Sequence, residues 1–285
     1  MILDRRVAGD RFITVSGLCR QLGMSRQNYY KEKRKRKTKS INEKLILELI
    51  KQERHLQPML GGRKLLNRLH KELTSETISM GRDRFFDLLR KHRLLIRKKP
   101  NNARTTNSDH GFRTYGNVFK DCIPKSPGDA WVSDITYIRT NEGFIYLSLI
   151  TDAFSRKIIG YDSGDSLEAT GCMKSLKQAF GQLASEKNPI HHSDRGSQYC
   201  CKDYIKLLKE RKLQISMTEE NHCYENAMAE RINGILKHEY GLKQEFKTKA
   251  QAKTAIKQSI QLYNEFRPHY KLDMRTPAEV HSLAA

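Results

Sequence analysis

The first regular hydrophobic pattern lies near the start of the printed chain, where apolar side chains recur every three or four positions. Its members are Val15, Leu18, Cys19 and Leu22. Gly23 favours the end of this helix, and Ser25 is a good N-cap for a second short helix that begins at Arg26. The pattern therefore predicts two short helices joined by a tight turn.

Two such helices form a helix-turn-helix motif, although a helical hairpin with no role in DNA binding would have the same pattern. In a helix-turn-helix, Arg26, Gln27 and Asn28 lie at the leading end of the recognition helix, where they can reach base edges or phosphates. Residues 31–39 hold seven Lys or Arg. This run indicates a solvated, flexible linker that can also follow the phosphates of DNA, with Lys33 and Arg34 among the contacts.

Apolar positions at helical spacing continue through residues 41–99, with breaks at Pro58 and at Gly61-Gly62. They predict a compact helical module. The residues that follow are polar and lack a regular apolar pattern, which is typical of a linker. The predicted domains are a helix-turn-helix with a basic tail at 1–38, a helical DNA-binding module at 39–99, a linker at 100–126 and a catalytic core at 127–285.

After the linker, the pattern changes to short runs of β-branched and aromatic residues. Three strands are predicted at 131–138, 144–151 and 157–161, the first two joined by a turn at Asn141-Glu142-Gly143. Helices and short strands then alternate, with helices at 167–186, 199–211, 224–240 and 248–266 and strands at 189–192 and 213–217. A meander of three strands followed by this alternation predicts an α/β fold, in which a mixed sheet carries helices on its faces.

Charge is distributed unevenly over the 285 residues, whose formal net charge is +21. Residues 1–110 carry a net charge of +17, and the remaining residues carry +4. A segment this basic attracts phosphate backbones through counterion release. An anionic membrane surface is the competing partner, but the segment lacks a basic amphipathic helix with Trp or Phe on one face. The charge therefore favours nucleic acid.

The six cysteines are scattered without a Cys-x-x-Cys pair, and no apolar run is long enough to cross a membrane. The first residues also lack the apolar stretch of a secretory signal, so we expect a cytoplasmic protein. His191-His192 and Cys200-Cys201 are the candidates for a zinc site. Adjacent residues point in different directions, which disfavours shared zinc coordination.

Three carboxylates carry the candidate chemistry. Asp134 lies inside the first predicted strand, where a carboxylate without a partner is costly. Asp194 follows the short fourth strand, the kind of position where open α/β sheets bind ligands, and Glu230 lies on the polar face of the helix at 224–240. Together they can hold a pair of Mg²⁺ ions, with Mn²⁺ as a substitute, roughly 3.5–4 Å apart for attack on a phosphodiester.

The spacing of the last two acids, with 35 residues between Asp194 and Glu230, resembles the DDE signature of retroviral integrases and insertion-sequence transposases. Several segments are similar to one transposase group, the second-frame products of IS-three type insertion sequences. These segments are Trp131-Val-Ser-Asp-Ile-Thr-Tyr, Thr151-Asp-Ala-Phe-Ser-Arg-Lys-Ile-Ile-Gly, His192-Ser-Asp-Arg-Gly-Ser-Gln-Tyr, Glu225-Asn-Ala-Met-Ala-Glu-Arg, Tyr263-Asn-Glu-Phe-Arg-Pro-His and Thr276-Pro. The resemblance covers essentially residues 10–282.

The resemblance implies a ribonuclease-H-like core with Asp134, Asp194 and Glu230 as its metal-binding catalytic acids. It also implies a transposase that binds the ends of an insertion sequence and catalyses Mg²⁺-dependent DNA strand cleavage and strand transfer. The implied partners are double-stranded DNA, as terminal inverted repeats and as target, and further copies of the chain. The upstream-frame product is another, because members of the group often act as frameshift fusions.

Two positions depart from the family pattern. Glu225 stands where the motif before the glutamate usually has Asp, and Gly61-Gly62 stands where the helical module usually has Tyr-Gly. The first change can alter a contact behind the acids and the second a packing contact. Neither removes a catalytic acid.

Three further residues have two interpretations each. Asp152 is either a fourth metal ligand or, as we favour, the cap of a strand end that pairs with Ser155 or Arg156. Lys237 and Arg195 are each either a DNA contact beside the acids or a solvated side chain. Two rival functions also stay open at this point: a DNA-binding regulator with an inactive core, and a metal-dependent nuclease without strand transfer.

Overall fold

The computed structural model describes residues 14–96, 112–184, 186–219 and 226–283. The chain divides into two compact units. The first comprises Met1–Glu53 and Leu69–Met80, and the second comprises Arg54–Arg68 and Gly81–Ala285. No described helix is long and apolar enough to cross a membrane.

The first unit begins with the two predicted helices, α2 (Val15–Gln21) and the start of α3 (Arg26–Leu56). The Ser25 hydroxyl accepts a hydrogen bond from the Asn28 N–H at 3.1 Å, which confirms the predicted N-cap. Gly23 adopts a φ of +63° in the turn, a conformation that glycine takes without strain. Leu18, Cys19 and Tyr29 bury themselves between the helices. The short helix α5 (His70–Ser75) also belongs to this unit.

The basic run at residues 31–39 is helical, so the prediction of a flexible linker there was wrong. Lys and Arg are good helix formers because their unbranched side chains lose little rotamer freedom, and an exposed helix keeps their charges in water. Glu32 and Lys35 also form an ion pair of 2.9 Å one turn apart. The proposed domain boundary between residues 38 and 39 therefore falls inside α3.

The second unit contains the end of α3 together with α4 (Gly62–Arg68) and α6 (Arg82–Lys91). The predicted breaks are confirmed, because α3 ends at Leu56, before Pro58, and α4 begins at Gly62. A Cβ atom on Gly62 would lie 3.0 Å from side-chain carbons of Phe86 and Leu89. Glycine at this position therefore permits the close packing of α4 on α6.

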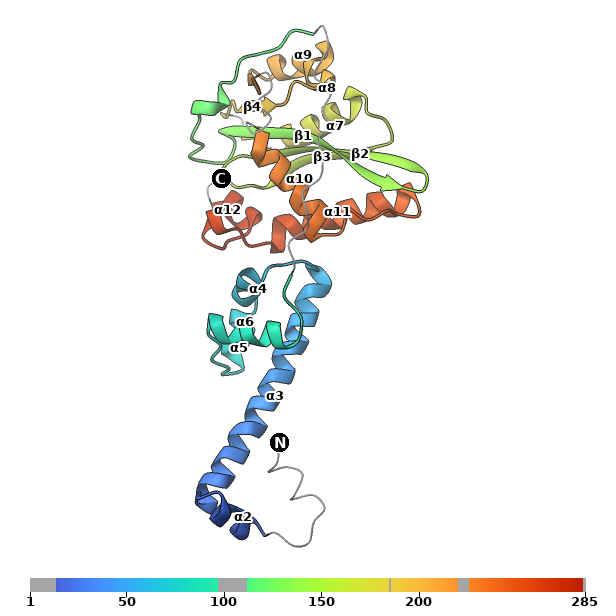
Figure 1. The fold of residues 1–285 in the computed structure, drawn as a ribbon. Coiled ribbons are helices and arrows are strands. Elements are labelled where there is room, and N and C mark those ends of the chain that lie inside the picture. The colour runs from blue at the N-terminus through green and yellow to red at the C-terminus, as the bar shows by residue number, and fades with distance from the viewer. Residues whose placement is uncertain (1–13, 97–111, 185, 220–225, 284–285) are drawn as a thin grey trace. The chain divides into compact units, whose positions relative to one another are not determined.

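A five-stranded mixed sheet forms the rest of this unit and confirms the predicted α/β class (Figure 1). Its strands are β1 (Ala130–Thr140), β2 (Gly143–Asp152), β3 (Ile158–Gly164), β4 (Ile190–Ser193) and β5 (Gln214–Met217). Their order in the sheet is β3-β2-β1-β4-β5. The first three strands are antiparallel neighbours, and β4 and β5 continue the sheet in parallel with β1.

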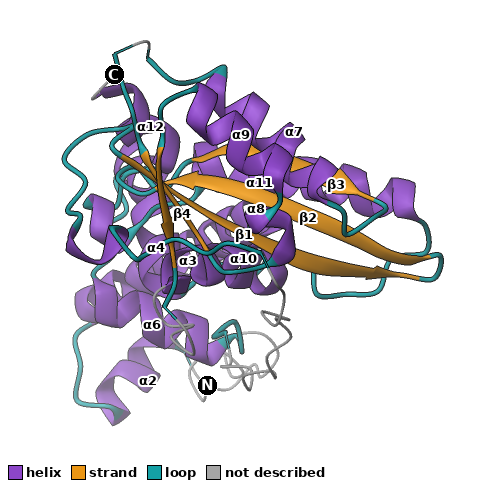
Figure 2. Ribbon diagram, turned by 90° about the horizontal axis from the view of Figure 1, so that it is seen from above, coloured by secondary structure: helices purple, strands orange, loops and turns teal. Residues whose placement is uncertain are grey.

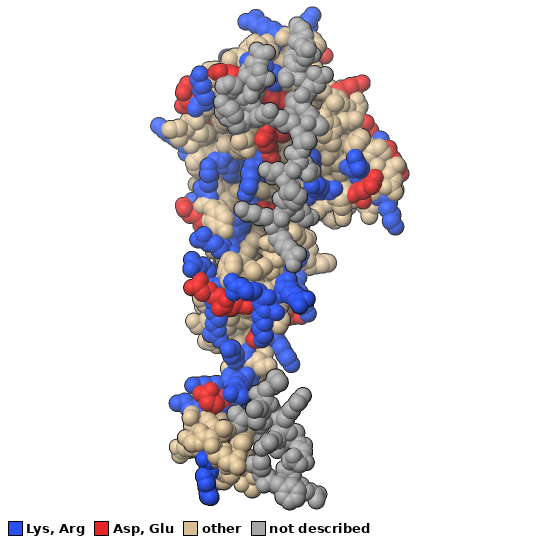
Figure 3. Space-filling model, viewed as in Figure 1, with Lys and Arg blue, Asp and Glu red and all other residues tan. Residues whose placement is uncertain are grey.

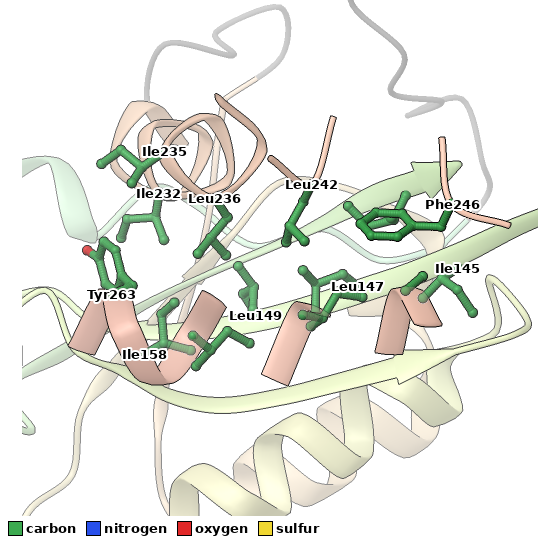
Figure 4. Close-up of a cluster of buried hydrophobic side chains, with 14 residues drawn as sticks. Ile145, Leu147, Leu149, Ile158, Ile232, Ile235, Leu236, Leu242, Phe246 and Tyr263 are labelled. Carbon is green, nitrogen blue, oxygen red and sulfur yellow. The ribbon is translucent and has the colours of Figure 1, made fainter. Parts of the chain in front are cut away.

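Helices cover both faces of the sheet (Figure 2). One face packs against α7 (Ala169–Phe180), α8 (Ser197–Cys200) and α9 (Lys202–Glu210), around residues such as Trp131 and Leu176. The other face packs against α10 (Ala227–Glu239) and α11 (Lys249–Phe266), where Leu147, Leu149 and Ile232 are buried together (Figure 4). Successive side chains of β2 point to opposite faces, with Leu147 and Leu149 in the second of these clusters and Ile150 in the first, as the two-residue repeat of a strand requires.

Three short elements beside the core were not predicted. The 3₁₀ turns η1 (Phe119–Asp121) and η3 (Tyr270–Leu272) and the last helix, α12 (Pro277–Leu283), have no counterpart in the sequence prediction. Residues 100–111 of the predicted linker lie outside the described residues, whereas its remainder contacts the core. Both Val118 N–H and Phe119 N–H donate to the Ser216 hydroxyl on β5 at 3.0 Å.

The histidines considered for zinc take part in buried hydrogen bonds. His191 Nε2 lies 2.8 Å from both the Ser133 hydroxyl and the Tyr204 hydroxyl, and His192 Nδ1 lies 2.9 Å from the Ser216 hydroxyl. The described cysteines are free thiols, and Cys223 lies outside the described residues. These contacts give both imidazoles a role in joining β4 to its neighbours.

Candidate active site

Asp134 lies in the middle of β1, as predicted, and its side chain is partly buried. One carboxylate oxygen accepts the Ile135 N–H at 2.9 Å, and the other accepts Asn233 Nδ2 at 2.7 Å. Burial, followed by the negative charge of Asp194, raises the pKa of Asp134 to about 7. The charge of Glu230 acts in the same direction.

Asp194 follows the last residue of β4, also as predicted. Its Oδ1 atom accepts the Gly196 N–H at 3.0 Å, so the turn after the strand holds the carboxylate. A Cβ atom on Gly196 would itself lie 3.0 Å from that oxygen. Glycine at this position therefore lets the backbone approach the carboxylate closely.

Glu230 lies in the first turn of α10 and is exposed. The same helix carries two buried asparagines that reach β1: Asn233 donates to Asp134, and Asn226 Nδ2 donates to the Ser133 carbonyl at 3.0 Å. These hydrogen bonds fasten the start of α10 to the strand that carries Asp134. The sequence prediction gave Asn233 no role, although the residue lies three positions after Glu230 and therefore on the same face of the helix.

Asp194 and Glu230 both lie near enough to Asp134 for their negative charges to raise its pKa. Among the described residues, no group of three or more His, Cys, Asp or Glu side chains already has the geometry of a metal site. The donors nonetheless suit Mg²⁺, because carboxylate oxygens are its preferred protein ligands and a bound cation would favour the charged form of Asp134, which burial and the neighbouring carboxylates disfavour. Coordination by all three requires the side chains to move closer together.

Two of the predicted DNA contacts lie near these acids. Lys237 is on α10, and burial lowers its pKa while the charge of Asp134 acts in the opposite direction. Arg195 follows Asp194 and donates from Nε to the Thr218 carbonyl at 2.7 Å. Both side chains are partly exposed.

The other predicted DNA contacts belong to the first unit. Arg26, Gln27 and Asn28 form the exposed first turn of α3, and Lys33 and Arg34 are exposed on the following turns. Basic side chains also cover much of the visible face of the chain, with fewer acidic ones among them (Figure 3). The leading end of the second helix is thus available to a ligand, as a helix-turn-helix requires.

Asp152 has a structural role. It is fully buried at the end of β2, where Ser155 donates to Oδ1 from both its N–H and its hydroxyl at 2.7 Å. The Gly128 N–H donates to Oδ2 at 2.8 Å. The predicted pairing with Ser155 is confirmed, and these hydrogen bonds engage both carboxylate oxygens.

Comparison with known proteins identifies the family. The integrase core domain family matches residues 124–223, and a second integrase core domain family matches residues 211–277. A 31 kDa protein of insertion element IS600 from Shigella sonnei, which is called uncharacterized, is 34% identical over 281 residues, covering 94% of this chain and 100% of that protein. The InsF transposase of insertion sequence IS3A from Escherichia coli is 33% identical over 162 residues, 56% of each chain. The chain belongs to the IS3 group of DDE transposases.

Other similarities of this transposase cover less of its length than the similarity to the IS600 protein does. The transposase of insertion element IS629 from Shigella sonnei is 34% identical over 177 residues, which are 62% of this chain and 60% of that protein. Among solved structures, the HTLV-2 integrase catalytic core with magnesium is 16% identical, covers 55% of this chain and 98% of that one, and gives a TM-score of 0.45. A simian T-cell lymphotropic virus intasome chain is 17% identical, covers 78% of this chain and 70% of that one, and gives 0.49.

Proposed function

We propose that Asp134, Asp194 and Glu230 are the acids with which this transposase binds Mg²⁺ and catalyses strand cleavage and strand transfer at the ends of an insertion sequence. The observation that carries the proposal is the environment of Asp134, where burial and then the negative charges of Asp194 and Glu230 raise its pKa to about 7. A site with this excess of negative charge favours a divalent cation, and Mn²⁺ can substitute for Mg²⁺ because it also accepts oxygen ligands.

The protein's own contribution is to orient the carboxylates. Asn233 and the Ile135 N–H hold Asp134, and the Gly196 N–H holds Asp194. When bound, the metal ions supply an activated attacking oxygen and stabilisation of the leaving oxygen. Glu230 stands on α10, which the asparagine contacts tie to β1, so it is well placed to complete the site.

DNA binding is divided between the two units in this proposal. Arg26, Gln27 and Asn28 read the terminal inverted repeats, and Lys33 and Arg34 contact their phosphates. Arg195 and Lys237 bind phosphates of the terminal or target DNA beside the acids. The active assembly contains several copies of the chain on DNA, with the upstream-frame product as a further partner, and it works at the nucleoid in the cytoplasm.

The test is the joining of labelled duplexes that carry candidate terminal repeats, in Mg²⁺ and in chelator. Asp134→Asn, Asp194→Asn and Glu230→Gln should each lower joining at least about 10³-fold while leaving DNA binding intact. Asp203→Asn, which neutralises an exposed acid on α9, is the matched control and should join DNA normally. Near-normal joining by any of the three acid variants would remove that residue from the site.

Product mapping separates the proposal from its rivals. Strand transfer yields new junctions between labelled ends and target DNA, whereas a nuclease yields cleaved ends alone and a regulator yields neither. Cleaved ends without junctions, under conditions that permit joining, would reduce the function to that of a nuclease.

A further inference from the structure

Residues 54–68 belong to the second unit and pack against the end of α11. Gln57 is almost fully buried, where its Nε2 donates to the Phe266 carbonyl and its Oε1 accepts the Tyr240 hydroxyl, both at 3.3 Å. The Arg68 guanidinium lies 5.6 Å from the centre of the Phe266 ring. These contacts hold α4 against the end of α11 and bring two distant parts of the sequence together.

Lys64 lies at this junction without an acidic partner. Its side chain is only 7% exposed, and its Nζ lies 5.3 Å from the centre of the Tyr270 ring. The Arg63 guanidinium lies 5.5 Å from the same ring. No hydrogen bond or ion pair joins Lys64 Nζ to any residue that the structure describes. Burying an ammonium group without a carboxylate costs free energy, so its presence here calls for an explanation.

The neighbouring charges are also mostly positive. Arg267 is 1% exposed and forms two hydrogen bonds of 2.8 Å with the carboxylate of Glu239. Burial, and then the charge of Arg267, lowers the pKa of Lys64 to about 8, and the charge of Arg231 on α10 adds to this. Glu239 is the one carboxylate that opposes the shift, and Arg267 already holds it. We call Lys64, Arg231 and Arg267 the cationic cluster.

The pKa of His269 also reflects this excess of positive charge. Burial, followed by the charges of Arg267 and Lys64, lowers the pKa of His269 to about 2. The imidazole is therefore neutral and accepts a hydrogen bond from Arg267 Nη1 at 2.9 Å. The cluster thus carries more positive charge than its described neighbours neutralise.

We propose that the cationic cluster binds a phosphate group of the DNA backbone. Lys64 supplies a compact positive charge and Arg231 a planar fork of donors, a combination that suits the two free oxygens of a phosphodiester. Lys64 Nζ is not among the fully enclosed unpaired atoms of the described side chains, and Arg231 is exposed, so an anion can reach the site from the surface.

A DNA strand is the favoured source of this phosphate, and the inference rests on the proposed DNA function. Arg231 follows Glu230 directly in α10, so the helix that carries a proposed catalytic acid also contributes to the cluster. Arg63 and Tyr270 are both exposed beside Lys64 and extend the site along the surface, as a polymer requires. A free phosphate ion would not require further side chains such as Arg63 and Tyr270 along the surface.

Binding of the full chain to a mixed-sequence DNA duplex, measured in chelator over a range of salt concentrations, tests the site. Each phosphate contact contributes about 0.9 to the slope of log affinity against log salt. Lys64→Met and Arg231→Gln should each make the slope shallower by about this amount and weaken binding several-fold. Lys206→Met, which removes an exposed lysine on α9, is the matched control and should bind as the unchanged protein does.

A second measurement reports on Lys64 itself. Reductive ¹³C-methylation gives each lysine an NMR signal, and the signal missing from Lys64→Met identifies Lys64. Saturation with the DNA duplex should raise the pKa of Lys64 by about one unit or more, because an opposite charge favours the ammonium form. A rise with inorganic phosphate but none with DNA would overturn the assignment to the DNA backbone. Unchanged slopes in both folded variants, with no rise on DNA, would overturn the site altogether.

These experiments separate this inference from the proposed function. No strand is cut in chelator, and Asp194→Asn should retain the full salt slope although it joins no DNA. If the acid variants lose joining while Lys64→Met retains its slope, the phosphate site is wrong and the transposase mechanism stands. If Lys64→Met has a shallower salt slope but an acid variant still joins DNA, the phosphate site stands and the assignment of that acid to the catalytic site is wrong.

Discussion

Two clusters of like charge, one acidic and one basic, occupy different parts of the second unit. In the acidic cluster, burial and neighbouring carboxylates raise the pKa of Asp134 to about 7. In the cationic cluster, burial and neighbouring guanidinium groups lower the pKa of Lys64 to about 8. Both shifts move the group towards its neutral form, because burial disfavours the charged form and like charges nearby add to this effect.

The clusters differ in how the protein holds the charged group. Asp134 has two hydrogen-bond donors, Asn233 and the Ile135 N–H, whereas Lys64 has an aromatic ring and no hydrogen-bond acceptor among the described residues. The first arrangement fixes the direction of a carboxylate, which suits a metal ion that requires defined geometry. The second leaves an ammonium group able to turn, which suits a phosphate along a flexible backbone. The four predictions that follow test this contrast, from the largest expected effect to the smallest.

Removing Glu239, the carboxylate that pairs with Arg267 of the cationic cluster, should have the largest effect. Glu239→Gln leaves the buried Arg267 without its ion-pair partner, which should lower the free energy of unfolding by about 3–5 kcal/mol. Chemical denaturation monitored by circular dichroism measures the change. Glu245→Gln, at an exposed position, is the control and should change stability little. Equal stability of the two variants would show that Glu239 does not hold the cluster together.

Removing the Asn233 amide, which orients the Asp134 carboxylate, should lower DNA joining, whereas the previous change lowers the stability of the fold. Asn233→Ala removes the hydrogen bond to Asp134, and contacts behind metal ligands typically contribute 10–100-fold, so joining should fall by about that factor. The deficit should shrink at high Mg²⁺ concentration if orientation for metal binding is the cause. Gln258→Ala, on the exposed face of α11, is the control. A loss that is independent of Mg²⁺ would contradict the orienting role.

Replacing the unpaired lysine should stabilise the protein. Because the pKa of Lys64 lies near 8 in the folded chain, the unfolded chain binds more protons between pH 8 and about 10.5. The stability of the unchanged protein therefore rises with pH across that window, and its deficit is fully present below pH 8. Lys64→Met should unfold at a higher temperature at pH 7, corresponding to about 1–3 kcal/mol, and should lack this rise.

The comparison with a control lysine decides that prediction. Lys206→Met should leave both the unfolding temperature and its pH dependence nearly unchanged, since Lys206 is exposed. If Lys64→Met unfolds at a lower temperature than the unchanged protein at pH 7, Lys64 is stabilising and the contrast with Asp134 fails.

The smallest expected effect is a change in the pKa of Asp134 in the absence of metal. Asp194→Asn removes one negative neighbour and should lower the pKa of Asp134 by up to about one unit, measured by ¹³C NMR of the carboxyl group in chelator. The pKa should stay above the ordinary aspartate value, because burial is the larger cause and persists. No change would show that the two carboxylates do not interact.

Much of the core was predictable from local pattern. Three elements were placed correctly: the strand that carries Asp134, the strand that Asp194 follows and the helix that carries Glu230. Alternation and helical periodicity allow this because they reflect burial on one face. The last helix was missed although its signal was present. Thr276 and Glu279 form a capping box in which the Glu279 N–H donates to the Thr276 hydroxyl at 3.2 Å and the Thr276 N–H donates to Glu279 at 2.7 Å.

The continuous helix α3 shows a different failure. A run of seven Lys or Arg was expected to be a linker because like charges repel. Helix propensity prevailed, because exposed basic side chains stay hydrated and the helix continues into a segment with buried Ile46 and Ile50. Charge repulsion alone was therefore a poor guide to local structure.

The amino-acid sequence by itself determined the order of the elements, the positions of the three acids and the family, since periodicity and motif spacing depend on neighbours along the chain. Only the tertiary structure decided which charges meet. Lys64, Arg231 and Arg267 come from α4, α10 and the residues after α11, and Asn233 reaches Asp134 from another element. The physical reason is that burial and electrostatic interaction depend on distance in space, which packing sets and local sequence pattern does not record.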